Sequence, residues 1–330
     1  MRDVVVDTDV IRDAVWLACR APSLHNSQPW RWIAQRHAVQ LFLDADRAPR
    51  STDTSGREAV IGCGAVLDHF RVAVAAAGWA TNVDRFPNPN NLDHLASVDF
   101  SPLDFVTDGH RSRAHAILQR RADLWPLAAP AHWEPFLELL RGTMDGLDVF
   151  LDVVAGEHHA QLARASQLAE SQRLYDSSYH SEIIGWTSGF SGADGIPPGA
   201  LLSATETERV DIARQFPSSP HPERRPDISA DHANVLVLST PDDTRRSALQ
   251  CGEALSAVLL DATMAGMATC TLTHITEVAA SRHVVATLIA RDAAPQVVVR
   301  VGDSPGTGDQ IPITPRRPIG DVFEVDPGSE

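Results

Sequence analysis

The sequence contains no lysine: every one of its 28 basic side chains is an arginine. This absence excludes a lysine Schiff base with a carbonyl cofactor and the lysine of a phosphate-binding P-loop. Recognition of an anion must therefore fall to arginine, whose planar guanidinium can donate two N–H groups to one phosphate.

Positive charge is also scarce overall, because the 330 residues carry a formal net charge of −15. Such a surface repels nucleic acid and anionic lipid, and no basic stripe interleaved with aromatic residues counters it. Apolar runs of the ~20 residues that a membrane helix needs are missing, as is the pattern of a secretory signal. We expect a soluble cytoplasmic protein that binds neither nucleic acid nor a membrane.

Motifs of several enzyme classes are missing as well. The four cysteines are scattered without a CxxC pair, and His158, His159 and His221 lack a carboxylate or second histidine at a metal-ligand spacing. No metal site is therefore predicted. Without a Gly-x-Ser-x-Gly elbow or a GxGxxG after a strand, the hydrolase and Rossmann dehydrogenase classes lose their usual support. No side chain is predicted to be catalytic.

Hydrophobic periodicity predicts helices and strands in alternation, which indicates an α/β or α+β architecture. Helices are expected over 9–19, with Asp9 as N-cap, and over 57–78, 113–121, 157–175 and 245–266. Strands are expected over 39–44, 96–100, 148–154, 235–238 and 296–301. The helix over 57–78 is apolar on most sides, so we expect it to be buried.

The two long helices resemble each other. A shift of 188 residues superposes Cys63-Gly64 on Cys251-Gly252, and the Ala-Gly-x-Ala-Thr segment starting at Ala77 on the one starting at Ala265. Two alanine-rich helices can align small residues by chance, but matches at both ends favour an internal duplication. A polar turn near residue 109 marks the expected end of the first half.

The segment 176–230 interrupts the alternation of helices and strands. Turn-forming glycine and proline dominate it, yet Tyr179, Trp186, Phe190 and Phe216 recur within it. Aromatic side chains cost free energy when they are left in water, so we expect this segment to pack on the rest of the chain as a lid.

The most specific local signal lies between Ala21 and Trp32. It resembles the Pro-Ser-x-x-Asn-x-Gln-Pro-Trp motif that contacts the flavin ring in nitroreductases, and it assigns ring contacts to Ser23, Asn26, Gln28, Pro29, Trp30 and Arg31. Hydroxyl and amide groups can bond the donors and acceptors of a flavin edge without adding charge. The alternative is a capped turn in which Trp30 and Trp32 anchor a hydrophobic core.

Two twin-arginine segments are candidates for binding the flavin phosphate. Arg120-Arg121 resembles the Arg-Arg-Ser/Thr-x-Arg motif of the nitroreductase family, although Ala122 replaces the hydroxyl residue. Arg316-Arg317 resembles the C-terminal segment that closes over the phosphate in that family. The alternative for both pairs is an ordinary solvated charge.

The two kinds of motif are divided between the halves. The first half has the ring motif without a twin arginine, and the second has both twin arginines without a ring motif. Because each flavin of a homodimeric nitroreductase contacts both subunits, the resemblance implies one complete flavin mononucleotide (FMN) site per chain. Leu272 and Thr273 correspond to the family loop whose backbone approaches flavin N5, and the end of a β-strand is the alternative interpretation.

Over nearly its whole length the chain resembles the Acg family of mycobacterial nitroreductase-like proteins. The resemblance implies an α+β, nitroreductase-like fold in which two fused halves, 1–109 and 110–330, form a monomeric pseudo-dimer around FMN. With 176–230 as a lid, the expected function is FMN sequestration or storage with weak or no turnover. The alternative is an active reductase that passes hydride from NAD(P)H to a nitroaromatic or quinone by a ping-pong mechanism.

Overall fold

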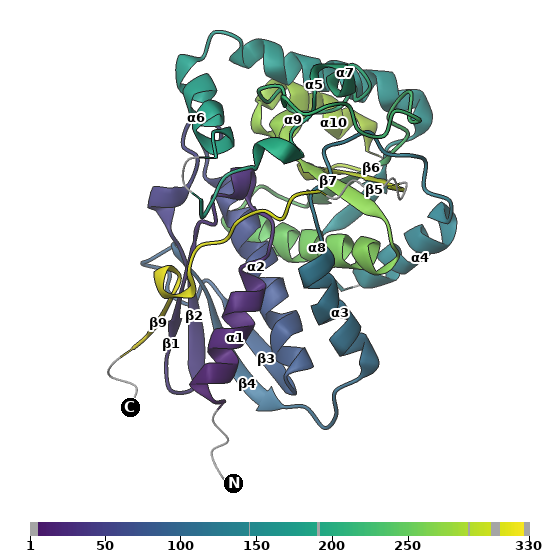
Figure 1. The fold of residues 1–330 in the computed structure, drawn as a ribbon. Helices are drawn as coiled ribbons and strands as arrows, with labels where there is room; N and C mark the ends of the chain where they lie inside the picture. The colour runs from purple at the N-terminus through teal and green to yellow at the C-terminus, as the bar shows by residue number, and fades with distance from the viewer. Residues whose placement is uncertain (1–5, 145, 190–191, 290, 305–310, 327–330) are drawn as a thin grey trace.

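The fold is built on two separate β-sheets (Figure 1). The computed structural model describes residues 6–144, 146–189, 192–289, 291–304 and 311–326. The first sheet has the order β3-β4-β2-β1-β9 and the second the order β5-β6-β8-β7. Within the described chain, paired strands run antiparallel except β1 and β9. The strands are β1 (Trp30–Ala34), β2 (Ala38–Leu43), β3 (Trp79–Arg85), β4 (His94–Pro102), β5 (Phe150–Val153), β6 (Asn234–Thr240), β7 (Ala268–Leu272), β8 (Ala294–Gly302) and β9 (Phe323–Val325).

Helices join and cover the two sheets, and the longest, α2 and α8, lie side by side in the middle of the molecule (Figure 1). They share one hydrophobic core with strands of both sheets. This mixture of antiparallel sheets and helices confirms the expected α+β class. The helices are α1 (Thr8–Ala18), α2 (Arg57–Ala76), α3 (Asp108–Gln119), α4 (Trp133–Met144), α5 (His159–Arg173), α6 (Ser177–Thr187), α7 (Ala204–Thr207), α8 (Arg245–Met264), α9 (His274–Glu277) and α10 (Ala279–Leu288).

The helices α2 and α8 make backbone contact at Gly64 and Gly252, the two glycines that the 188-residue shift superposes. A methyl group on Gly64 would lie 2.0 Å from the carbonyl oxygen of Leu249, and one on Gly252 would lie 2.0 Å from that of Ile61. Ile61 and Leu249 are related by the same shift. The contact is therefore symmetric, because each helix presents the same position to the other, and only glycine allows so close an approach.

Most sequence expectations survive with shifted boundaries. All ten predicted helices and strands have a counterpart in the structure. The expected N-cap of α1 is wrong: Asp7 is the cap, and its carboxylate accepts a hydrogen bond from the backbone N–H of Asp9 (2.9 Å), which lies inside the first turn. Periodicity does not predict β3, whose residues are mostly half-buried on both faces, or β9, which has three residues.

Helix α2 is long and apolar enough to cross a membrane by length and composition alone. However, 72% of its most apolar stretch is buried inside the fold, where it packs against α8 and α1. The apolar side chains of α2 are thus covered by other parts of the protein, as expected for a core helix.

We expect that Gly64→Ala destabilises the protein by about 3 kcal/mol, because the added methyl group must push α8 away from α2. The measurement is the free energy of unfolding from a urea titration.

Gly142→Ala in α4 is the matched control, because nothing lies within 4 Å of the position that its methyl group would take. It should keep the parent stability or gain about 0.5–1 kcal/mol from the better helix propensity of alanine. Equal stability of the two variants would contradict the proposed close contact.

Candidate functional site

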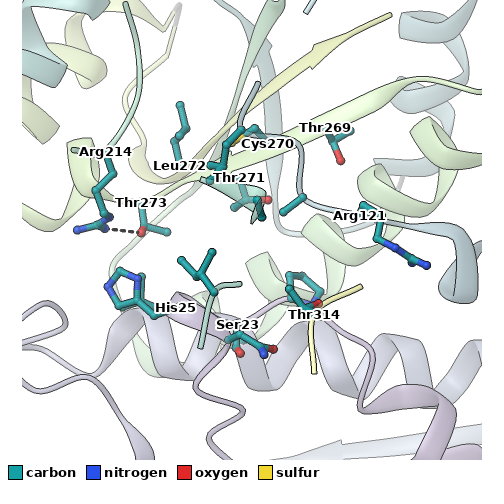
Figure 2. A pocket seen from close by; sticks show the side chains of 18 of the residues that line it. Ser23, His25, Arg121, Arg214, Thr269, Cys270, Thr271, Leu272, Thr273 and Thr314 are labelled. Atoms are coloured by element: carbon teal, nitrogen blue, oxygen red, sulfur yellow. Dashed lines mark hydrogen bonds between the residues drawn. The ribbon is translucent and has the colours of Figure 1, made fainter. Parts of the chain in front are cut away.

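A cavity of about 170 Å³ lies where the turn after α1, the face of α2 and the end of β7 meet. Figure 2 shows His25, Arg214 and Thr273 together at one end of this cavity and Arg121 at the other, with Ser23 and the run from Thr269 to Leu272 on opposite walls between them. Further lining comes from the segment 176–230, through Ile196, Ala200, Arg214 and Phe216, and from the C-terminal tail, through Ile311, Pro312, Thr314 and Arg316.

The turn that carries the ring motif has an unusual backbone. His25, Asn26 and Gln28 have φ values of 53°, 59° and 52°, in the left-handed region that non-glycine residues rarely adopt. Each such residue costs roughly 1–3 kcal/mol, so the surrounding structure must hold the turn in place.

Hydrogen bonds made by the amide side chains of Asn26 and Gln28 stabilise this turn. Asn26 Nδ2 donates to the carbonyl oxygens of Gly195 (3.1 Å) and Pro315 (3.0 Å). Gln28 Nε2 donates to the carbonyl oxygen of Ala193 (2.9 Å), and its Oε1 accepts from the backbone N–H of Arg317 (2.9 Å). The motif amides therefore tie the turn to the segment 176–230 and to the C-terminal tail.

Three arginines, Arg120, Arg121 and Arg316, line one end of the cavity, and they cluster with Arg20, which lies outside its lining. Arg120 and Arg316 both donate to the carbonyl oxygen of Arg20, at 3.1 and 2.9 Å. Arg316 Nε also donates to the carbonyl oxygen of Cys19 (2.7 Å). Among the described residues, no carboxylate forms an ion pair with any of the four, so they form a cluster of uncompensated positive charge.

Burial makes this cluster electrostatically unfavourable. Burial, and then repulsion from the guanidinium groups of Arg20 and Arg121, together lower the pKa of Arg120 to about 10. Burial followed by repulsion from Arg120 and Arg20 also holds the pKa of Arg316 well below its usual value. The buried Nε of Arg120 has no hydrogen-bond partner among the described residues. Because buried donors in folded proteins are nearly always satisfied, this arrangement is suited to an anion.

At the other end the charges are balanced. Arg214 donates to the hydroxyl of Tyr179 (3.0 Å), to Thr273 Oγ1 (3.2 Å) and to the carboxylate of Glu277. Burial opposes its charge, but Glu277 and Tyr179 outweigh burial and raise the pKa of Arg214. Burial, and then Arg214, holds the pKa of His25 well below its usual range, so this imidazole is neutral at pH 7.

Glu58 adds a buried carboxyl group to the cavity wall. Residues Glu58, Ile61 and Gly62 line the cavity from one face of α2, at the spacing that brings side chains onto one side of a helix. The Arg57 guanidinium donates a hydrogen bond to the Glu58 carboxyl group. The Asp53 side chain is hydrogen-bonded to the same carboxyl group. Burial and the Asp53 bond raise the pKa of Glu58 to about 8, against the opposing effect of Arg57.

Seven of the residues predicted from sequence line the cavity: Ser23, Asn26, Arg120, Arg121, Leu272, Thr273 and Arg316. The other five, Gln28, Pro29, Trp30, Arg31 and Arg317, are not among its lining residues. Leu272 is also the last residue of β7, so the alternative of a strand end describes its position too.

Strand β1 explains why the second part of the ring motif leaves the cavity. Successive side chains of a strand point to opposite faces. Trp30 and Trp32 are fully buried in the core, as the core-anchor alternative expects, and Arg31 faces outward near Glu324 (3.8 Å). Arg317 lies behind the turn, where its guanidinium donates to the carbonyl oxygen of Gln28 (3.2 Å) and to Asp44 (3.4 Å).

Sequence reasoning missed Arg20, His25, Glu58 and Arg214. His25 lies inside the recognised motif, and Arg20 directly precedes it, so their proximity to the motif could have pointed to both. Glu58 and Arg214 have no local signal, because only the tertiary fold brings them to the cavity.

Three proteins of Mycobacterium tuberculosis are similar to this chain over nearly their whole length. The "Putative NAD(P)H nitroreductase acg" is 60% identical over 325 residues, covering 98% of each chain. An uncharacterized protein is 49% identical, covering 96% of this chain and 93% of its own. A second putative NAD(P)H nitroreductase is 34% identical, covering 96% and 92%. No family model matches the sequence.

Solved structures show a weaker likeness. The FMN-dependent nitroreductase NfnB from Mycobacterium smegmatis in complex with NADPH is 15% identical, with a TM-score of 0.40, and the match covers 65% of this chain and 97% of that one. A nitroreductase with bound FMN from Desulfitobacterium hafniense is 13% identical, with a TM-score of 0.39, covering 64% and 95%. These scores are too low to support an argument, so the family rests on the sequence relatives.

We expect the stability of the ligand-free protein to fall as the pH rises through the range in which Glu58 titrates. The folded protein holds this proton to about pH 8, whereas a glutamate with its ordinary pKa of 4.5 releases it earlier in the unfolded chain. Unfolding therefore becomes easier with rising pH, by up to about 1.4 kcal/mol per pH unit from this group.

Glu58→Gln has no proton to lose, so its free energy of unfolding should vary less between about pH 5 and pH 8. Denaturant titrations at several pH values measure this difference. Glu324→Gln, at an exposed position, should keep the pH dependence of the parent. An unchanged pH dependence in Glu58→Gln would show that Glu58 titrates normally.

Proposed function

The chain belongs to the mycobacterial family of nitroreductase-like proteins that includes acg of M. tuberculosis, and on that premise we propose that it binds FMN in the cavity. One observation carries the proposal: Arg120, Arg121 and Arg316 line one end of the cavity and cluster with Arg20, without an acidic partner for any of the four among the described residues. A phosphate monoester supplies the missing negative charge, and the unpartnered Nε of Arg120 is a free donor for one of its oxygens.

The residues along the cavity also suit the rest of FMN. Ser23 and Thr273 offer hydroxyl groups, while Ile61, Leu255 and Leu272 offer apolar surface for a flat ring. We place the phosphate at the arginine end and the isoalloxazine ring toward His25, Arg214 and Thr273 (Figure 2). When bound, FMN supplies two-electron chemistry that no side chain provides, and the protein binds and orients it.

We further propose that the halves 1–109 and 110–330 form an intramolecular pseudo-dimer with one FMN per chain. The symmetric contact of Gly64 and Gly252 supports a duplicated origin of α2 and α8. Both halves contribute to the cavity, because Ser23 and Glu58 come from the first and Arg121 and Thr273 from the second. The uneven distribution of the ring motif and the twin arginines supports a single complete site.

We propose that the segment 176–230 is a lid, and that the protein sequesters or stores FMN rather than turning it over rapidly. Glu182 in this segment accepts hydrogen bonds from the backbone N–H groups of Ser51 (2.9 Å) and Thr52 (2.8 Å) in the first half. The bonds from Asn26 and Gln28 fasten the same segment from the other side. Tyr179 is buried and Phe216 packs edge-to-face on His25, whereas Phe190 lies outside the described residues.

The second candidate is an active NAD(P)H-dependent reductase of nitroaromatics or quinones. The names of two M. tuberculosis relatives favour it. It requires the lid to open, as lids of enzymes do on microsecond to millisecond timescales, so that nicotinamide and acceptor reach the ring in turn.

We expect one FMN per polypeptide and a weaker complex when an arginine of the cluster is removed. Arg121→Ala should lower the affinity for FMN about 10- to 100-fold, because a hydrogen bond between charged groups contributes about 1.5–3 kcal/mol. Mass spectrometry of the denatured protein gives the FMN ratio, and a fluorescence titration gives the affinity.

Arg31→Ala is the control, because Arg31 belongs to the same recognised motif but faces outward from β1. Its affinity for FMN should equal that of the parent. A molar ratio of zero would overturn the FMN proposal, a ratio near two would overturn the single site, and equal affinities of Arg121→Ala and the parent would place the phosphate elsewhere.

We expect bound flavin to be reduced slowly in the parent protein and faster in Glu182→Ala. The variant loses the hydrogen bonds from the backbone N–H groups of Ser51 and Thr52 to the lid. The population of the open conformation should therefore rise about 10- to 100-fold. Stopped-flow absorbance after anaerobic mixing with NADPH measures the rate of bleaching.

Glu138→Ala is the control for this experiment, because Glu138 is exposed and pairs only with Arg141 of its own helix among the interactions of the described chain. It should bleach at the parent rate. Rapid bleaching of the parent itself would exclude sequestration and favour the reductase.

A further inference from the structure

We propose that Glu58 is the internal proton donor of this site, supplying a proton from its carboxyl group to the ring of the bound flavin during two-electron transfer. The inference rests on the proposed binding of FMN and goes beyond it by assigning a chemical role to a residue. Nothing in the sequence motifs points to this residue.

The position of Glu58 brings an acid to the cavity wall. Its side chain is only 3% exposed, and it lies one helical turn from Ile61 and Gly62, which line the same wall. The backbone of Gly62 is close to Ser23: a methyl group added there would lie 3.4 Å from the Ser23 Cβ. Glu58 is therefore on the helix face that meets the ring-motif turn.

Hydrogen bonds around Asp53 indicate which carboxyl group of the pair holds the proton. Asp53 Oδ2 accepts from the backbone N–H of Ala59 (2.8 Å) and Oδ1 from Ser55 Oγ (3.4 Å), at the N-terminus of α2. Backbone donors and the helix dipole both favour a negative charge there. Two hydrogen-bonded carboxyl groups cannot both ionise cheaply, so the proton resides on Glu58.

The charged groups that face Glu58 favour a proton that can leave and return. The negative charge of Glu277 in α9 opposes ionisation of Glu58. Arg173 and Arg214 form ion pairs with Glu277 and partly offset this repulsion. Arg57 donates to Glu58 and to the carbonyl oxygen of Thr276 (2.8 Å), which fixes its guanidinium in place. A Glu58 carboxylate is therefore neutralised by Arg57 once its proton has left. The raised pKa of Glu58, about 8, agrees with a proton held at neutral pH.

An internal acid would supply the one proton that hydride transfer to the flavin does not deliver. A reduced nicotinamide delivers a hydride, which carries two electrons and one proton, and the reduced ring takes up one further proton. Residues of the proposed lid, 176–230, line this cavity, so an acid inside the site would supply the proton without entry of bulk water. With FMN bound, Glu58 would give up its carboxyl proton to a ring nitrogen and would remain as a carboxylate beside the Arg57 guanidinium. Glu58 regains its proton when the ring is reoxidised by an acceptor that takes hydride alone, or from water when the lid opens.

The test compares Glu58→Gln with the parent protein loaded with FMN. Infrared difference spectra between oxidised and dithionite-reduced protein detect a protonated carboxyl group directly, without turnover. The parent should lose a carboxylic acid band on reduction, and Glu58→Gln should show no such change. General acid catalysis contributes about 10²- to 10⁴-fold, so anaerobic reduction by NADPH should slow by that factor in the variant. Its affinity for FMN should remain that of the parent.

Asp68→Asn is the matched control, because Asp68 lies on the same helix, its pKa is also raised by burial, and it does not line this cavity. It should keep the reduction-sensitive band. Parent protein labelled with ¹³C-glutamate provides a measurement that needs no variant, because the label should shift the band. A band that persists in Glu58→Gln, or that does not respond to reduction in the parent, would overturn the role of Glu58. Failure of the parent to bind FMN would instead overturn the proposed function.

Discussion

The backbone contact of α2 with α8 at Gly64 and Gly252 is the constraint on which the rest of the structure depends. These helices share their core with both sheets, so their separation sets the distance between the two halves of the fold. Ile61 and Gly62 of α2 and Leu255 of α8 also line the cavity. The width of the cavity therefore depends on two core positions, Gly64 and Gly252, that have no Cβ atom and do not line the cavity themselves.

Sequence reasoning found the features that are encoded locally. The long helices, their 188-residue relation and the turn at Ser23 and Asn26 each follow from periodicity or from a contiguous motif. The sequence did not show that Trp30 and Arg31 point away from the cavity. Their direction depends on where the turn ends and strand β1 begins, which no local motif reveals. Glu58 and Arg214 also escaped prediction, since the sequence separates them by more than 150 positions from each other. Only the fold shows that both residues line the same cavity.

The two ends of the cavity differ in how their charge is balanced. Arg214 is neutralised by Glu277 within the protein, whereas the cluster around Arg120 keeps its repulsion. The protein thus retains an unfavourable arrangement where a ligand can relieve it, as functional sites commonly do. An anion that binds only the folded state stabilises it by mass action, so occupancy and folding are thermodynamically linked.

The path of the C-terminal tail has a consequence for the order of assembly during synthesis. Strand β9 joins the first sheet beside β1, and Arg316, immediately before it, joins the arginine cluster. Chains emerge from the ribosome N-terminus first, at about 5–20 residues per second. The edge of β1 that faces β9 therefore stays unpaired, and the arginine cluster incomplete, until residues 316–325 have been synthesised. Helices α2 and α8 are synthesised before Arg316, so the arginine end is the last wall of the cavity for which the chain becomes available.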